Sequence, residues 1–384
     1  MSAVQVGLVK YFSRERTVLM NADADSRDGT VDLVKAAAVR DYRSFLASSP
    51  LRSARTITAS YHPGRGQAGA LRLLMAAADL LRAKACAVVS PDSASITPEW
   101  IEALIRPVYR DGFDLLSPVY QRHRFEGLLV RNVLAPMLGA AYGYAIEEPS
   151  PDELGFSGAL ARHFLAQDVW QEDFMRAGAF MWITASALAG NFHIGQSFLG
   201  PKTHAGRNSG PGLAETIQHV VGALFSSLET YENSWRGRTT IETVPLFGFP
   251  SEIDLAPLRV NRKKAFEMFR NGTPEIAGIL AEILSPDILN EILRVAQSEE
   301  VSTPFPDELW VKTVYEFAAS YHHRVMNRDH LLQALTPLYR GRVSSYLREN
   351  RGLPLAELRG RREALQREFE RWKPYLVEKW SAKA

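Results

Sequence analysis

Short apolar segments alternate with amphipathic ones through the first quarter of the chain, and this alternation constrains the fold more than any other feature. Strand-like segments lie at 17–20, 54–60 and 85–89, and segments with helical spacing lie at 4–12, 30–47 and 68–81. Such alternation predicts a mostly parallel sheet with helices on both faces. Ligands of these sheets bind where the strands end, at their carboxyl ends.

After about residue 250 the pattern changes to one of helices alone. Apolar residues recur at three- and four-residue spacing, and Pro, Asp, Asn or Gly mark the ends of the segments. The segment 355–380 is charged and periodic, which predicts a solvent-facing helix. We therefore expect two domains, an α/β domain at 1–248 and a helical domain at 249–384.

Composition excludes several classes of protein. The 384 residues include 45 Lys and Arg against 43 Asp and Glu, so no strong basic field favours nucleic acid. The single cysteine, Cys86, excludes an internal disulfide and suits a reducing compartment. The start of the sequence lacks a signal-peptide pattern, and the apolar stretch 133–146 is too short to span a bilayer. We expect a cytoplasmic protein with small-molecule partners, and a homo-oligomer is compatible with the sequence.

An acidic turn follows the first strand-like segment. Asp23, Asp25 and Asp28 lie just before a helical pattern. Clustered carboxylates repel one another, so such a cluster often holds a ligand. Helix capping is an equally simple explanation, because a carboxylate there satisfies free N–H groups at the start of the helix.

Three further segments carry polar groups of interest. The Gly-rich loop 61–72 holds Arg65, the strand-like segment at 85–89 leads to Asp92, and 197–207 holds Lys202, His204 and Arg207. Backbone N–H groups and cations in such loops bind phosphate. Taken singly, each segment has an ordinary structural explanation as a turn or a hydrogen-bonded loop.

Taken in order, the four segments resemble the nucleotide-sugar-dependent glycosyltransferases of the GT-A fold. The resemblance is greatest to the mannosylglycerate and glucosylglycerate synthase group and spans roughly residues 5–350. The stretch 305–350 is similar to the helical C-terminal part of that group. The fold that this resemblance implies is α/β, of Rossmann-like GT-A type, with a helical C-terminal domain.

The resemblance implies a metal-dependent hexosyltransferase that uses a nucleoside-diphosphate sugar such as UDP-glucose. The acceptor would be small, such as glycerate or its phosphate. A divalent cation, Mg²⁺ or Mn²⁺, would neutralise the leaving diphosphate. The matching positions are Asp92 and His204 for the metal, Asp23 and Asp25 for the nucleoside, Arg65, Lys202 and Arg207 for the diphosphate, and Glu153 with Asp152 for the sugar. An ordinary loop before a helix is the alternative for the segment 146–158.

Several departures from the group's pattern favour a second reading. Ser90 replaces the first Asp of the Asp-x-Asp motif, Pro151 and Asp152 replace two glycines, and Phe180 stands where an acceptor-binding Asp is usual. The first strand of the fold is also missing from this sequence, which would leave two unpaired sheet edges. The alternative is a weak or inactive homologue that binds a nucleotide or a partner. A nucleotidyltransferase ranks last, because no GxxxxGK[ST] loop is present.

Overall fold

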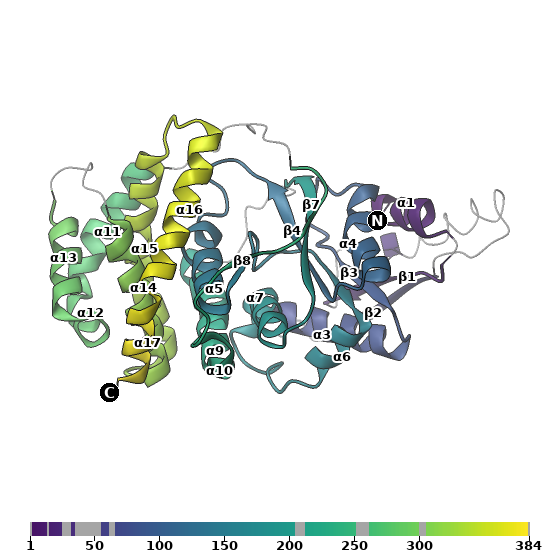
Figure 1. The fold of residues 1–384 in the computed structure, drawn as a ribbon, viewed down its shortest axis with the longest axis horizontal. Helices are drawn as coiled ribbons and strands as arrows, with labels where there is room; N and C mark the ends of the chain where they lie inside the picture. The colour runs from purple at the N-terminus through teal and green to yellow at the C-terminus, as the bar shows by residue number, and fades with distance from the viewer. Residues whose placement is uncertain are drawn as a thin grey trace. The chain divides into compact units, whose positions relative to one another are not determined.

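The computed structural model describes residues 2–13, 15–24, 32–34, 55–60, 66–203, 212–250, 261–298 and 305–382 (Figure 1). The chain forms two compact units that are interleaved in sequence. Unit 1 comprises Met1–Gln121, Pro151–Asn208 and Pro245–Ser251, and unit 2 comprises Arg122–Ser150, Ser209–Val244 and Glu252–Ala384. The domain boundary at 248 remains a prediction, because compactness does not test independent folding.

Unit 1 contains the main sheet of the protein. Its five strands have the order β3-β6-β4-β7-β9, with bounds Ala85–Val88, Leu154–Ser157, Leu115–Gln121, Ile194–Pro201 and Leu246–Phe247. Strand β6 is antiparallel to both of its neighbours, whereas β4, β7 and β9 are mutually parallel. The predicted α/β class with a mostly parallel sheet is confirmed.

Two further strands form a separate parallel pair in unit 1. Strand β1 (Val18–Asp23) pairs with β2 (Arg55–Ser60) in a continuous register from Val18 opposite Arg55 to Asp23 opposite Ser60. Among the described strands, β1 pairs only with β2, and β3 only with β6. All four residues of β3 are half-buried, whereas all seven of β4 are buried. Strand β3 is therefore an edge strand.

The helices of unit 1 pack in two groups. Helix α1 (Ser2–Phe12) packs on α4 (Pro98–Asp111), and α3 (Gly66–Leu80) packs on α6 (Gly158–Leu165) and α7 (Met175–Ala189). The sequence of α4 explains its bounds. Pro98 fits the first turn, where its missing N–H is not needed, and Gly112 ends the helix at φ +77°. Between them an apolar stripe from Trp100 to Val108 is buried.

Unit 2 is helical apart from the two-residue strands β5 (Tyr144–Ala145) and β8 (Glu242–Thr243), which pair with each other. Its first helices are the π-helical turn η2 (Val130–Leu134), α5 (Ala135–Tyr142), α8 (Leu213–Thr216), the π-helical turn η3 (Ile217–Val221), α9 (Gly222–Thr230) and α10 (Glu232–Trp235). The later ones are α11 (Arg262–Glu275), α12 (Ala277–Ile283), α13 (Pro286–Ala296), α14 (Asp307–His323), α15 (Arg328–Glu349), α16 (Leu355–Arg371) and α17 (Lys373–Ser381). The predicted helical C-terminal region is confirmed.

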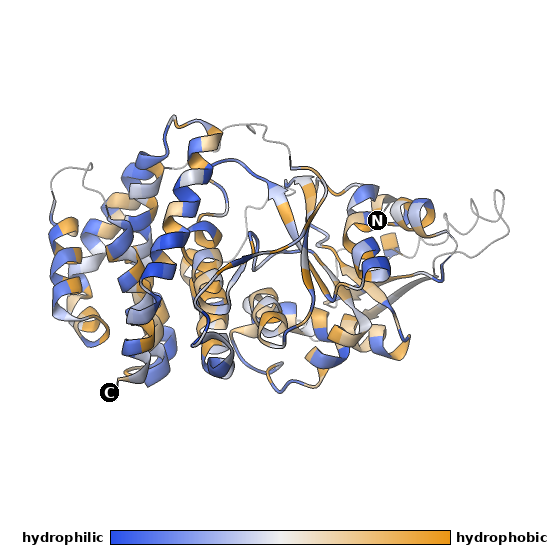
Figure 2. Cartoon of the chain, in the orientation of Figure 1, coloured by the Kyte–Doolittle hydropathy of each residue, from blue (hydrophilic) through white to orange (hydrophobic). Residues whose placement is uncertain are grey.

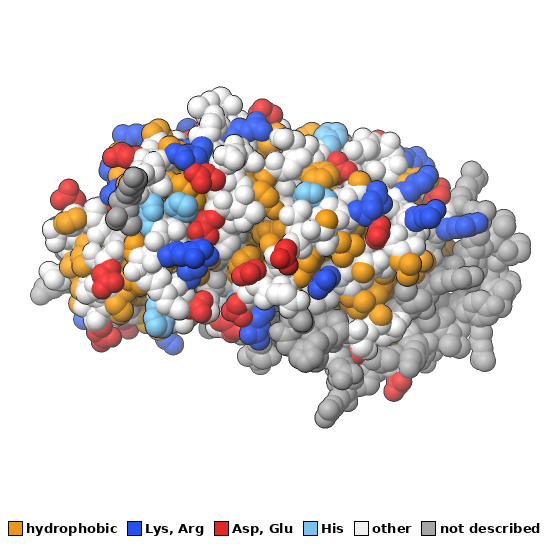
Figure 3. Space-filling model, turned by 90° about the horizontal axis from the view of Figure 1, so that it is seen from below, with side chains coloured by type: hydrophobic (Ala, Val, Ile, Leu, Met, Phe, Trp, Pro, Cys, Tyr) orange, Lys and Arg blue, Asp and Glu red, His pale blue; other side chains and the backbone are white. Residues whose placement is uncertain are grey.

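The polarity of α16 matches its exposure to solvent. Figure 2 shows α16 as largely hydrophilic, and only three of its side chains are buried, Leu358, Leu365 and Phe369. This agrees with the solvent-facing helix predicted over the first part of 355–380. The helix ends at Arg371, however, and the following α17 buries Lys373, Leu376 and Trp380. On the face shown in Figure 3, acidic and basic side chains are interspersed. None of the described helices combines the length and apolar character needed to cross a membrane.

Candidate functional site at the strand ends of unit 1

Four strands of the main sheet bring their ends to one edge. The carboxyl ends of β3, β4 and β7 meet there, and the amino end of β6 joins them because β6 runs in the opposite direction. Backbone hydrogen bonds tie the loop after β3 to the end of β7. Ala94 N donates to Thr203 O at 3.0 Å, and Thr203 N donates to Ser95 Oγ at 3.0 Å. This edge is where a ligand of such a sheet is expected.

A buried ion pair lies at this edge. Glu153, immediately before β6, is fully buried, and Lys202, immediately after β7, is 2% exposed. The Lys202 ammonium lies 2.5 Å from both carboxylate oxygens of Glu153. It also donates to Ser93 Oγ at 2.9 Å, and the hydroxyls of Ser93 and Tyr120 each donate to the carboxylate. Each hydrogen bond described for the Glu153 carboxylate therefore has an ammonium or a hydroxyl group as its donor.

Aromatic rings complete the enclosure of the Lys202 ammonium. Its nitrogen lies 4.9 Å from the ring centroid of Tyr120 and 5.8 Å from that of Trp100. A cation over an aromatic face is attracted by the ring's negative charge distribution. The pairing of β4 with β7 shifts register between Val119 and Tyr120, where β7 carries one extra residue, Leu199. The four groups thus form a satisfied polar cluster inside an apolar wall.

Two other carboxylates extend this cluster toward solvent. Asp152 Oδ2 lies 3.5 Å from the Lys202 ammonium, and the Asp152 side chain is 28% exposed. Asp92 is exposed in the loop after β3, and its backbone N–H donates to Ser90 Oγ at 3.3 Å. Asp152 is thus a carboxylate of the Lys202 cluster that solvent can reach.

The other predicted site residues fall into two groups. Asp23 is buried at the carboxyl end of β1, which pairs with β2 and not with the main sheet. Asp25, Arg65, His204 and Arg207 lie outside the described residues. Their roles, and those of Asp92, Asp152, Glu153 and Lys202, remain predictions.

Three of the four positions that depart from the group's pattern are Phe180, Pro151 and Ser90, and the structure describes their surroundings. Phe180 is 6% exposed and belongs to the core of α7, where its carbonyl accepts from Thr184 Oγ1. Pro151 is buried next to Asp152, and Ser90 is half-buried and holds the turn to Asp92. Packing alone therefore explains Phe180.

Sequence reasoning missed Ser93, Tyr120 and Trp100. The strand that carries Tyr120 contains Pro118, and a proline argues against a central strand. The feature that could have revealed this strand is the mostly apolar run 115–120. It lies between Gly112 and the polar run that starts at Gln121. Ser93 and Trp100 gave no sign in the sequence, because their roles depend on contacts with residues far along the chain.

The described residues do not by themselves form a divalent cation site. No group of three or more His, Cys, Asp or Glu side chains among them converges to hold an ion. Lys202 already places a positive charge beside Asp152. A cation at this edge would therefore depend on further ligands, from a substrate or from residues such as His204.

Comparisons with known proteins give a likeness among solved structures. No family model matches the chain, and no curated protein matches it. Among solved structures, it is similar to the crystal structure of glucosyl-3-phosphoglycerate synthase from Mycobacterium tuberculosis in complex with phosphoglyceric acid. The two share 15% identity over 60% of this chain and 83% of the other, with a TM-score of 0.36.

Proposed function

We propose that the protein is a glycosyltransferase of GT-A type that moves a hexose from a nucleoside-diphosphate sugar to a small acceptor such as glycerate or phosphoglycerate. The observation that supports this most is the contact of Lys202 with Glu153 and Asp152 at the strand ends of unit 1, beside Ser93 of the loop that carries Asp92. The resemblance of the sequence to GT-A glycosyltransferases assigns Asp92, Asp152, Glu153 and Lys202 to one site. The donor base, the sugar and the acceptor belong to the proposal.

Each residue of the edge has a distinct proposed task. Asp152 is the partly exposed carboxylate, so it would accept a hydrogen bond from a sugar hydroxyl. Glu153 has both oxygens held by donors, so it would keep Lys202 and the start of β6 in place. Lys202 would supply positive charge near the departing diphosphate, which is the charge that grows during transfer.

A divalent cation, Mg²⁺ or Mn²⁺, is part of this proposal through Asp92 and His204. Bound there with the donor's phosphates, it would neutralise the leaving group. Only Asp92 of this pair lies within the described residues. The contacts that the structure describes at this edge are those of Lys202 with Asp152 and Glu153. Asp92 would draw the cation and its nucleotide to the edge by charge.

One observation favours a second candidate function. The Lys202 ammonium is enclosed by Glu153, Ser93 and two aromatic rings, so diphosphate reaches it only if the cluster opens. A protein in which the cluster stays closed would bind nucleotide weakly and transfer no sugar. We therefore keep a catalytically inactive nucleotide- or partner-binding homologue as the alternative.

A turnover assay separates the two. The purified chain is incubated with UDP-glucose, Mn²⁺ and either glycerate or 3-phosphoglycerate, and UDP release is followed against a no-acceptor control. Acceptor-dependent release supports the transferase, and NMR of the product then gives the anomeric outcome. Nucleotide binding without release supports the inactive homologue.

A further inference from the structure

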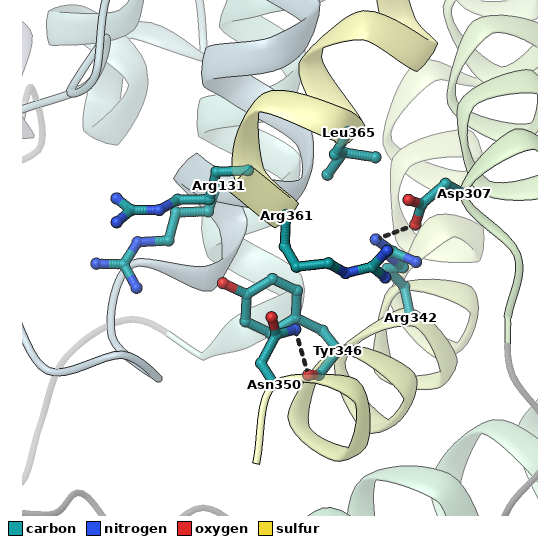
Figure 4. Close-up of a pocket in the computed structure, with 8 residues that line it drawn as sticks. Arg131, Asp307, Arg342, Tyr346, Asn350, Arg361 and Leu365 are labelled. Carbon is teal, nitrogen blue, oxygen red and sulfur yellow. Dashed lines mark hydrogen bonds and ion pairs between the residues drawn. The ribbon is translucent and has the colours of Figure 1, made fainter. Parts of the chain in front are cut away.

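Four arginine side chains gather around one hollow in unit 2 (Figure 4). They are Arg131 of η2, Arg342 of α15, and Arg361 and Arg362 of α16. Asp307 of α14 is the one acidic residue among those that line the hollow. Positive charge therefore exceeds negative charge here, although the charges of the whole chain nearly cancel.

Two of the four arginines have carboxylate partners. Arg342 is 2% exposed, lies 2.6 Å from Asp307, and donates to Asn132 Oδ1 at 3.0 Å. Arg361 lies 2.7 Å from Glu349, outside the hollow's lining. Each of these two arginines therefore already has a negative partner, so an added anion is not needed to balance its charge.

The other two arginines have no carboxylate partner in the described part of the chain. Arg131 donates only to backbone carbonyls, those of Arg124 at 2.7 Å and His123 at 3.5 Å. The exposed Arg362 makes no hydrogen bond or ion pair with any described residue. Desolvation, and then the positive charge of Arg362, lower the pKa of the Arg131 guanidinium. Tyr346 and Glu148 act in the opposite direction, yet the pKa stays below its usual value, so an anion between the two guanidinium groups would relieve their repulsion.

A buried acceptor in the same hollow points to the kind of anion. Asn350 is 1% exposed, and its amide nitrogen donates to Tyr346 O at 2.7 Å. Its Oδ1 is buried without a hydrogen-bond partner. A buried acceptor left without a donor is costly, so a ligand that brings an O–H group would gain by meeting it. Sulfate has no such group, whereas hydrogen phosphate has one.

We propose that this hollow is a binding site for a small phosphoryl anion that carries a proton, of which hydrogen phosphate is the simplest. A water-sized sphere does not fit inside the hollow as it stands, so the exposed Arg362 side chain would have to move aside to admit the anion as far as Asn350 Oδ1. Arg131 and Arg362 would donate to its charged oxygens in the forked geometry that guanidinium groups give to phosphate. Asn350 Oδ1 would accept from its O–H group. The site is separate from the transferase proposal and does not depend on it.

The test measures phosphate binding to the full chain by calorimetry at pH 6.5, with sulfate and chloride at equal ionic strength. The key variant is Arg362→Ala, because this side chain has no described contact to lose on truncation. The matched control is Arg367→Ala, which removes the same charge from a 65% exposed position of the same helix outside the hollow. Arg131→Lys keeps the positive charge and removes the forked hydrogen-bond geometry of the guanidinium group.

We expect saturable phosphate binding that Arg362→Ala weakens about tenfold, as loss of a charge-assisted hydrogen bond should. Arg131→Lys should weaken it by a smaller factor, and Arg367→Ala should leave it unchanged. Equal loss in Arg362→Ala and Arg367→Ala would overturn the site, and so would phosphate binding no stronger than chloride. Sulfate binding as tight as phosphate would overturn the role given to Asn350.

Discussion

Lys202 and Glu153 form a buried ion pair in which one ammonium nitrogen lies 2.5 Å from both oxygens of one carboxylate. The two residues flank different strands, β7 and β6, and both strands end at the candidate site. The pair therefore stabilises this edge of the sheet and also fixes the positions of two residues of the candidate site. Changes at either residue should affect folding as well as ligand binding.

Removing the charge of Glu153 should destabilise the protein strongly. Glu153→Gln leaves the Lys202 ammonium buried with only the partly exposed Asp152 for balance, and breaking such a pair costs about 3 to 5 kcal/mol. The free energy of unfolding from urea titration measures this. The control Glu308→Gln breaks a pair with Lys312 whose acidic partner is 47% exposed, and should cost less than about 1 kcal/mol. Equal losses in the two variants would contradict the buried-pair account.

The pair also predicts a rescue. In the double variant Glu153→Gln, Lys202→Met no uncompensated charge is left inside the cluster. It should therefore recover at least half of the stability lost in Glu153→Gln alone, because the dominant penalty is the unpaired ammonium. A double variant no more stable than the single one would show that the cost comes from lost packing.

Part of this architecture could be read from the sequence. Strand β2 and helix α3 lie within two residues of the predicted segments 54–60 and 68–81. In α3 the buried residues Ala68, Leu71, Met75 and Ala78 have the helical spacing on which the prediction rested. Strand β4 was not predicted, because Pro118 argues against a central strand. The pairing of Lys202 with Glu153 was not predicted either. A basic residue near a Gly-Pro turn suggests a phosphate ligand, and only the fold shows that a carboxylate 49 positions earlier neutralises it.

A methyl group at Gly155 should disrupt the same edge through packing. A Cβ at this position would lie 2.0 Å from the carbonyl oxygen of Leu104, so β6 and α4 could not keep their contact. We expect Gly155→Ala to destabilise the chain by about 3 kcal/mol in thermal or urea unfolding. The control Gly360→Ala meets nothing within 4 Å on the exposed side of α16, and should stabilise by up to about 1 kcal/mol. Similar effects at both glycines would refute this close packing.

Cys86 should react slowly in the native protein. Burial in β3 raises the pKa of its thiol to about 11, so the thiolate fraction at pH 8 is roughly a hundredth of that in the unfolded chain. Iodoacetamide at pH 8, followed by mass spectrometry, should label the native chain about a hundredfold more slowly than the chain in guanidinium chloride. Comparable rates would mean that the thiol is open to solvent.

Lys373 should make stability depend on alkaline pH. Its ammonium donates to the carbonyls of Ala141, Trp235 and Arg238, and burial, followed by the charge of Arg238, lowers its pKa to about 8. Between this pKa and the unfolded value near 10.5, the unfolded chain binds more protons, so stability contributed by this group rises with pH. The difference in unfolding free energy between the wild type and Lys373→Met should therefore increase from pH 7.5 to pH 10. A flat difference would show that the pKa is not lowered.

If the strand ends of unit 1 bind a nucleoside diphosphate, calorimetric titration of UDP in the presence of Mn²⁺ should detect it. We expect saturable one-to-one binding, with a Kd below about 1 mM, that Asp92→Asn weakens at least tenfold. The exposed control Asp329→Asn, in unit 2, should leave the binding unchanged. No saturable heat with or without Mn²⁺, or equal effects of the two substitutions, would show that no nucleotide site lies at this edge.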